Sequence, residues 1–122
     1  MRALRYDRFG SPDVLEVVDI PEPAPRAGEV KVRVHAASLN PLDWKLRAGH
    51  LRWLPMFRGP PRTLGTDFAG EIVGVSAGVR SHFVGERVFG SLRPFGRDGA
   101  LAEHLVAAVD RLAGSSDRAK PP

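Results

Sequence analysis

The stretch that decides the fold is Thr63-Leu64-Gly65-Thr66-Asp67-Phe68-Ala69-Gly70-Glu71-Ile72-Val73-Gly74-Val75, in which three glycines interrupt a strand-like run. Residues 68–76 are predicted to form one long strand. Glycine inside a strand allows a bend and lets a second backbone approach closely, as the corners of a small barrel require. Further short strand patterns, separated by turn residues, lie on both sides of this stretch. The pattern predicts a mainly β domain, a barrel or a sandwich.

Strands are also expected at 2–6, 14–20, 29–36, 87–92 and 100–107, with a last piece at 109–113. The first two should form a hairpin, because Gly10 and Pro12 are turn residues. Residues 21–28 contain three prolines, which lack the N–H needed inside a sheet, so this segment is predicted to be an extended connector. The clearest period of two places one set of apolar side chains on a buried face: Val30, Val32, Val34 and Ala36.

One short helix is predicted from Pro41 to Ala48. Asn40 is a favourable N-cap, proline suits the first helical position, and Gly49 can end the helix in the left-handed conformation. Residues 49–62 show no clean period and are expected to form a loop, and loops on a rigid scaffold often contact ligands.

Length and composition limit the class of protein. The 122 residues, 43% of them apolar, suffice for one domain with one core. The absence of cysteine excludes disulfides, thiolate nucleophiles and cysteine-based zinc sites. No apolar run approaches the ~20 residues of a membrane-spanning helix, so a soluble, cytoplasmic protein without a membrane partner is expected. A domain is predicted at 1–113, and the polar residues 114–122 are expected to be a disordered tail or linker stump.

The net charge of +4 is concentrated in one segment. Residues 44–62 contain five cations and no acid, interleaved with aromatic residues. Such a pattern could attract the phosphates of a nucleotide or a nucleic acid, or it could be a solvated basic loop with aromatic anchors. Since basic residues do not recur elsewhere as a stripe, no nucleic-acid partner is expected.

Seven motifs, in order along the chain, resemble the medium-chain dehydrogenase/reductase superfamily and are closest to its quinone oxidoreductase-like members. They are Met1-Arg2-Ala3, Gly10-Ser11-Pro12-Asp13-Val14-Leu15, Gly28-Glu29-Val30, Ser38-Leu39-Asn40-Pro41-Leu42-Asp43, the Leu64 to Gly74 run, Gly85-Glu86-Arg87-Val88-Phe89-Gly90 and Gly99-Ala100-Leu101-Ala102-Glu103-His104. The resemblance covers residues 1–113. It implies a GroES-like domain, a partly open β-barrel with one or two short helices. In the family this domain precedes a Rossmann domain that binds NADPH. No Gly-x-Gly-x-x-Gly motif follows a strand here, so the Rossmann domain is expected to be absent from this chain.

The resemblance also implies a zinc-free member. Where zinc-dependent relatives carry a metal-binding Cys and His, this chain has Asn40 and Thr66. The four histidines show no metal-ligand spacing between any two, so no metal site is predicted.

The implied function is that of the substrate-side domain of a zinc-independent, NADPH-dependent quinone oxidoreductase or of a related enoyl or alkene reductase. Asn40 and Thr66 would be catalytic, Asn40 and Pro41 would lie at the cofactor, and Trp53 and Thr66 would contact a quinone or enone. Asn40 could instead be a helix cap alone, and Trp53 could be a buried anchor. Asp43 and Asp67 are expected to be structural rather than an acid–base pair. The chain by itself is expected to be inactive.

Two alternatives remain open at this point. The chain could be a stand-alone β-barrel that binds or assembles with a partner, since a fold alone does not determine function. It could also be a degenerate fragment without catalysis. An apolar face left uncovered would favour self-association, for example as a homodimer.

Overall fold

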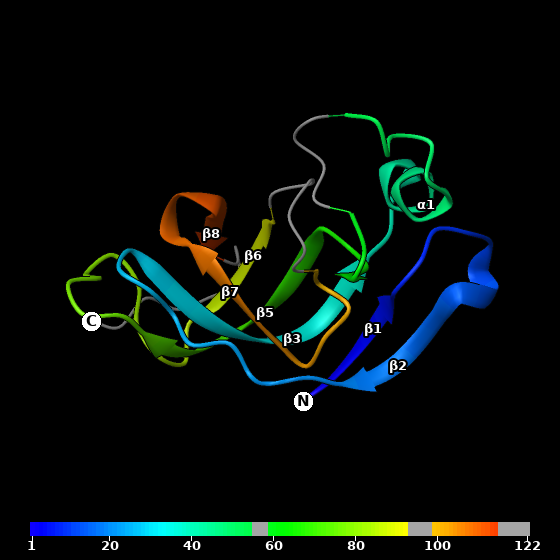
Figure 1. Cartoon of the computed structure of the whole chain (residues 1–122). Coiled ribbons are helices and arrows are strands. Elements are labelled where there is room, and N and C mark those ends of the chain that lie inside the picture. Colours follow the sequence, from blue (N-terminus) through cyan, green and yellow to red (C-terminus); the bar gives the residue numbers. More distant parts are fainter. Residues whose placement is uncertain (55–58, 93–98, 115–122) are drawn as a thin grey trace.

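The computed structural model describes residues 1–54, 59–92 and 99–114, which form two antiparallel sheets and one α-helix (Figure 1). The smaller sheet has the strand order β2-β1-β4, and the larger has the order β7-β3-β5-β6-β8. A single bridge from Ala3 to Ala102 joins β1 to the segment before β7. The described strands do not close into a complete barrel, which confirms the predicted mainly β, partly open architecture.

The predicted opening hairpin is confirmed. Strand β1 (Arg2–Tyr6) pairs with β2 (Leu15–Asp19) from Arg2↔Asp19 to Tyr6↔Leu15. A 3-10 turn, η1 (Pro12–Val14), begins the return, with Ser11 as its N-cap. The other edge of β1 pairs with β4 (Arg62–Thr63), a strand of two residues that begins at the last residue of the loop predicted at 49–62. Two residues are too short for a period to be recognised.

The larger sheet is built around β3 (Glu29–Ser38) and β5 (Asp67–Val75). Strand β6 (Arg87–Ser91) pairs with β5, and β7 (His104–Ala108) pairs with β3. The strand predicted at 100–107 begins only at His104, because the amides of Ala100 and Leu101 bond to Gly65 and Leu64 instead. The piece predicted at 109–113 is a 3-10 turn, η2 (Val109–Arg111), followed by β8 (Leu112–Gly114). Gly114 thus belongs to a strand, and the tail predicted beyond it lies outside the described residues.

A bulge changes one predicted core position. The register of β3 against β5 shifts between Val34 and Ala36. As a result, Ala36 is exposed and Ala37 packs against the core instead. A bulge inserts one residue on one side of the ladder and so reverses the faces that follow it. The prediction that Ala36 faces the core was therefore wrong, whereas Val30 and Val32 are fully buried as predicted.

Two apolar clusters hold these elements together. The larger lies under the five-stranded sheet and contains Val30, Val32, Phe68, Ile72, Val88, Leu92, Ala100, Leu105 and Ala107. The smaller cluster packs the hairpin against the segment that precedes β5, and it consists of Tyr6, Val14 and Leu64. The segment leading to Thr66 is thereby held between both clusters.

Helix α1 (Pro41–Ala48) has the predicted bounds. Asn40 caps its first turn, and Gly49 ends it in the left-handed conformation with φ of 88°. The helix lies above the end of the β1–β2 hairpin (Figure 1). Two hydrogen bonds attach it to the hairpin turn: the Gly10 amide donates to the Arg47 carbonyl at 3.0 Å, and Arg47 Nη1 donates to the Gly10 carbonyl at 2.7 Å.

Candidate functional site

The structure brings Asn40 and Thr66 together across 26 positions of sequence. Asn40 Nδ2 donates to Thr66 Oγ1 at 3.2 Å. Asn40 Oδ1 accepts from the backbone N–H of Leu42 at 3.0 Å. The backbone N–H of Asn40 donates to Asp43 Oδ2 at 2.8 Å. The cap requires an acceptor at the helix amide, so the oxygen of the Asn40 side chain faces the helix and the nitrogen faces Thr66.

The two side chains differ in accessibility. Thr66 is only 4% exposed, and its carbonyl accepts from the Leu92 amide at 2.7 Å. Asn40 is half-buried. Its NH₂ group has two hydrogens, and one of them is donated to Thr66. Asn40 can therefore offer one more N–H to a ligand, while Thr66 holds the amide in place.

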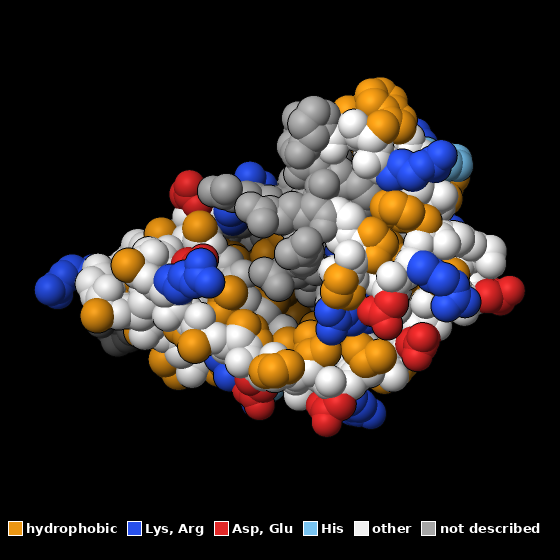
Figure 2. Space-filling model, viewed as in Figure 1, with side chains coloured by type: hydrophobic (Ala, Val, Ile, Leu, Met, Phe, Trp, Pro, Cys, Tyr) orange, Lys and Arg blue, Asp and Glu red, His pale blue; other side chains and the backbone are white. Residues whose placement is uncertain are grey.

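Asn40 lines a groove of about 390 Å³ beside the helix, which we call the α1 groove. Its apolar lining consists of Pro12, Leu15, Leu39, Pro41 and Leu64. Trp44 adds an aromatic side chain, and Asp43 and Arg47 add one charge of each sign. Figure 2 shows hydrophobic and basic side chains next to each other over the part of the surface formed by α1. The groove combines apolar area with a few fixed polar groups, as ligand-binding sites generally do.

Buried polar groups lie behind the groove. Asp43, Tyr6 and Arg62 are each 1% exposed. Burial raises the pKa of the Tyr6 hydroxyl above its usual value of 10.0, while the positive charge of Arg62 lowers it and the negative charge of Asp43 adds to the rise. Among the described residues, Asp43 Oδ1 has no hydrogen-bond partner. Asp43 Oδ2 accepts from the backbone N–H of Asn40 and so completes the capping box of α1. This position agrees with the structural role predicted for Asp43.

The other predicted site residues occupy different surroundings. Pro41 lines the α1 groove next to Asn40. Trp53 lies in the turn that follows α1, and 73% of its surface is exposed, which rules out the buried anchor. Trp53 does not line the α1 groove. Asp67, at the start of β5, accepts from Ser91 Oγ at 2.6 Å.

Among the described residues, Trp44 is the one aromatic lining residue of the groove, and the sequence interpretation did not predict it as a site residue. It is 47% exposed, and the His50 ring packs edge-on against it at 5.3 Å between centroids. A signal for it did exist. Residues four apart share a helix face, so the predicted helix places Trp44 on the same side as Asn40.

The described part of the chain holds neither a cluster of metal-ligand side chains nor a helix that could span a membrane. Within it, no three His, Cys, Asp or Glu side chains gather in a way that could hold a metal ion. Likewise, no helix in residues 1–54, 59–92 and 99–114 is long and apolar enough to cross a membrane. His82 pairs with Glu86 at 3.1 Å.

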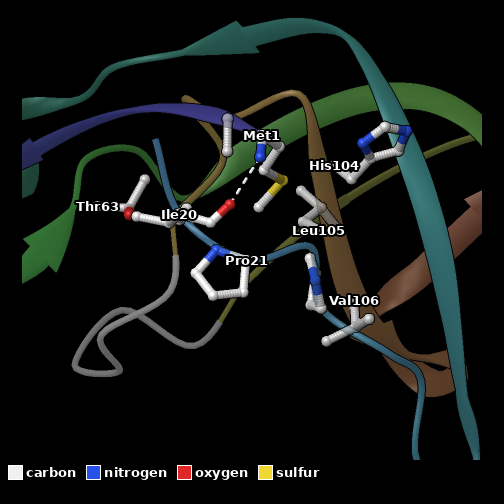
Figure 3. A pocket seen from close by; sticks show the side chains of 10 residues that line it. Met1, Ile20, Pro21, Thr63, His104, Leu105 and Val106 are labelled. Carbon is white, nitrogen blue, oxygen red and sulfur yellow. Dashed lines mark hydrogen bonds between the residues drawn. The ribbon is translucent and has the colours of Figure 1, made fainter. Parts of the chain in front are cut away.

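A second, smaller cavity lies between the N-terminus and β7 (Figure 3). Its volume is about 70 Å³, and Met1, Ile20, Pro21 and His104 are among its lining residues. The terminal ammonium of Met1 donates to the Ile20 carbonyl at 2.6 Å and closes one side. The cavity is well below the ~300 Å³ at which ligand pockets begin, so it is not a candidate substrate site.

The fold and the order of the motifs together define a GroES-like domain of the medium-chain dehydrogenase/reductase superfamily. The family model described as "alcohol dehydrogenase GroES-like domain" matches residues 26–117. The chain belongs to this family.

Several of its curated relatives carry the quinone oxidoreductase name. The chain is 42% identical over 109 residues to the chloroplast envelope quinone oxidoreductase homolog of Arabidopsis thaliana, covering 88% of this chain and 32% of the relative. It is 37% identical to the human quinone oxidoreductase, covering 88% and 31%. The chain thus spans about a third of the length of the curated relatives it matches.

Solved structures agree with these relatives. The quinone oxidoreductase from Coxiella burnetii superimposes with a TM-score of 0.84 at 34% identity, covering 96% of this chain and 37% of that chain. The Escherichia coli quinone oxidoreductase, solved in complex with NADPH, superimposes with a TM-score of 0.81 at 26% identity, covering 93% and 33%. The expected resemblance to quinone oxidoreductase-like members is confirmed.

Proposed function

We propose that this chain is the substrate-side domain of an NADPH-dependent quinone oxidoreductase, with enones as the related substrate class. One observation carries the proposal. At the start of α1, the side-chain amide of Asn40 donates one hydrogen bond to Thr66, and its second N–H is left for a ligand. The names of the similar proteins supply the substrate class, and the E. coli structure supplies the cofactor.

Bound NADPH would supply the hydride. The residues of this chain would orient the substrate and stabilise its reacting oxygen. The remaining N–H of Asn40 would donate to the carbonyl oxygen as it gains negative charge, and such a fixed donor stabilises an oxyanion without reorganising. Thr66 would keep the amide aimed, and Pro41 would offer an apolar ring to the flat nicotinamide. Trp53 is proposed to lie at the substrate opening.

A zinc-independent reaction is part of the proposal. Asn40 and Thr66, at the positions that the resemblance assigns to metal ligands, hydrogen-bond to each other. The lone pair of an amide nitrogen is delocalised into the carbonyl group, so the Asn40 nitrogen that faces Thr66 is a hydrogen-bond donor and not a metal ligand. This bond supports oxyanion stabilisation by hydrogen bonding instead of by a metal ion.

NADPH binding would require a second domain as partner. The relatives are about three times as long as this chain. We propose that their remaining two-thirds correspond to the NADPH-binding partner domain, and that this chain without such a domain does not oxidise NADPH.

The test compares the full chain alone with the full chain fused to the part of the E. coli enzyme that it does not match. NADPH oxidation with 1,4-naphthoquinone is followed at 340 nm. We expect activity only in the fusion.

Within the fusion, N40D should lower kcat on the order of 100-fold, because aspartate keeps the helix cap but removes the N–H donor. T66S, which keeps the hydroxyl, should remain close to wild type, and T66V should lose activity.

Three outcomes would count against the proposal. An inactive fusion that is folded would contradict the assignment to a reductase and favour a stand-alone binding module. NADPH oxidation by the chain alone would contradict the need for a second domain. An N40D fusion as active as wild type would remove Asn40 from the chemistry.

A further inference from the structure

We propose that the α1 groove binds the flat ring of the substrate and that Trp44 forms its aromatic wall. This inference rests on the proposed function for the chemistry of the ligand. It adds a specificity-determining residue, Trp44, and a binding surface to the Asn40–Thr66 pair.

Size and apolar exposure support a ring-shaped ligand. The groove volume of about 390 Å³ falls within the ~300–1,000 Å³ range of small-molecule sites. Two of its large apolar side chains face water, Leu39 at 56% and Trp44 at 47% exposure. A ligand that covers them would remove apolar area from water, and this burial stabilises the complex by ~25 cal/mol for each Å². The His50 ring packed against Trp44 restricts the indole, so less side-chain freedom is lost on binding.

The polar groups of the groove select an uncharged acceptor. Asn40 lies one helical turn before Trp44 and has one N–H to donate, which suits a carbonyl oxygen. Asp43 is only 1% exposed and lies one helical turn before Arg47, so its buried carboxylate offsets the positive charge of Arg47 from behind the groove and neither anions nor cations are favoured. A flat conjugated ring bearing a carbonyl group, as in a quinone, satisfies the apolar wall and the donor together.

The second tryptophan makes the inference testable within the same chain. Trp53 is 73% exposed and lies outside the α1 groove. The chain has two tryptophans in total, so a ¹⁵N-labelled sample should show two indole N–H signals, and W53F would assign them. The absence of cysteine is also useful, because an added quinone cannot react with a thiol.

The first experiment titrates the labelled full chain with 1,4-naphthoquinone. We expect the Trp44 indole signal to shift and saturate. W44A should weaken binding about tenfold through lost ring contact, and W44F should recover most of it. F89A removes an aromatic side chain of similar exposure from β6 and should leave binding within about twofold of wild type. The remaining amide signals show whether each variant is folded.

The second experiment measures KM in the fusion, where W44A should raise KM for 1,4-naphthoquinone about tenfold relative to F89A. A saturating shift of the Trp53 signal alone, two unmoved indole signals, or a W44A protein that binds like wild type would each overturn the inference. An active fusion with unchanged KM in W44A would overturn it while leaving the proposed function intact. An inactive, folded fusion would contradict the proposed function. The NMR titration alone would then show whether the α1 groove binds 1,4-naphthoquinone.

Discussion

Gly70 lies where β5 runs closest to β3. A Cβ atom at this position would collide with the Arg33 carbonyl and approach Val32 Cγ1 to 2.8 Å. Gly74, four residues further along the same strand, has only an ordinary contact at 3.6 Å, to Lys31 Cβ. These two of the three glycines in the stretch 63–75 therefore have different roles. The backbone requires glycine at Gly70, whereas it tolerates a side chain at Gly74.

We expect Gly70→Ala to lower the free energy of unfolding by about 2–3 kcal/mol, because β3 and β5 must separate to admit the methyl group. Gly74→Ala serves as the matched control and should change stability by less than about 0.5 kcal/mol. Urea unfolding followed by tryptophan fluorescence measures both. Equal losses in the two variants would contradict the close approach at Gly70.

At the scale of elements, α1 and the hairpin turn behave as one unit. Arg47 uses its carbonyl and its guanidinium to hold both polar groups of Gly10. Pro12 and Leu15, which continue from this turn, form one side of the α1 groove, and Trp44 and Asn40 form the other. The shape of the groove thus depends on the contact between two elements that are distant in sequence.

We expect Arg47→Ala to cost about 1 kcal/mol of stability, the value of a typical hydrogen bond, and to speed hydrogen exchange at the Gly10 amide. Lys45→Ala, an exposed cation on the same helix, is the control. Native-state hydrogen exchange followed by NMR reads both effects. If Gly10 remains equally protected in the two variants, the attachment does not depend on the Arg47 side chain.

At the scale of the whole molecule, two surface carboxylates connect different segments of the chain. Glu22, in the proline-rich connector, bonds to Lys31 of β3, which lowers the pKa of the Glu22 carboxyl. Glu103 accepts from the Arg2 amide, and this bond lowers the pKa of Glu103. Each carboxyl thus binds its proton less readily in the folded chain than in the unfolded chain, and its ionised form favours folding.

The expected consequence is a loss of stability in acid. Because the folded pKa of each group lies below its usual value of 4.5, its contribution is present above pH 4.5 and is lost as pH falls through the folded pKa. The double variant E22Q/E103Q should show a smaller difference between its urea midpoints at pH 7 and pH 3 than wild type. Glu16→Gln in β2 controls for the removal of an exposed charge. An unchanged difference in the double variant would contradict this role.

The sequence by itself determined the features that depend on neighbouring residues. The β1–β2 hairpin follows from its turn residues, and the bounds of α1 follow from Asn40, Pro41 and Gly49, because caps and turns are satisfied within a few positions. The family follows from the order of the motifs.

Only the tertiary structure decided the rest, since it requires partners far apart in sequence. Strand β4 exists because β1 pairs with it, and the exposure of Ala36 results from a bulge against β5. The sequence predicted Asn40 and Thr66 as site residues, but their hydrogen bond, and hence the direction of the amide, depends on β5 reaching the start of α1. The α1 groove likewise exists only where the helix meets the hairpin turn, because a local pattern cannot specify the space between two elements.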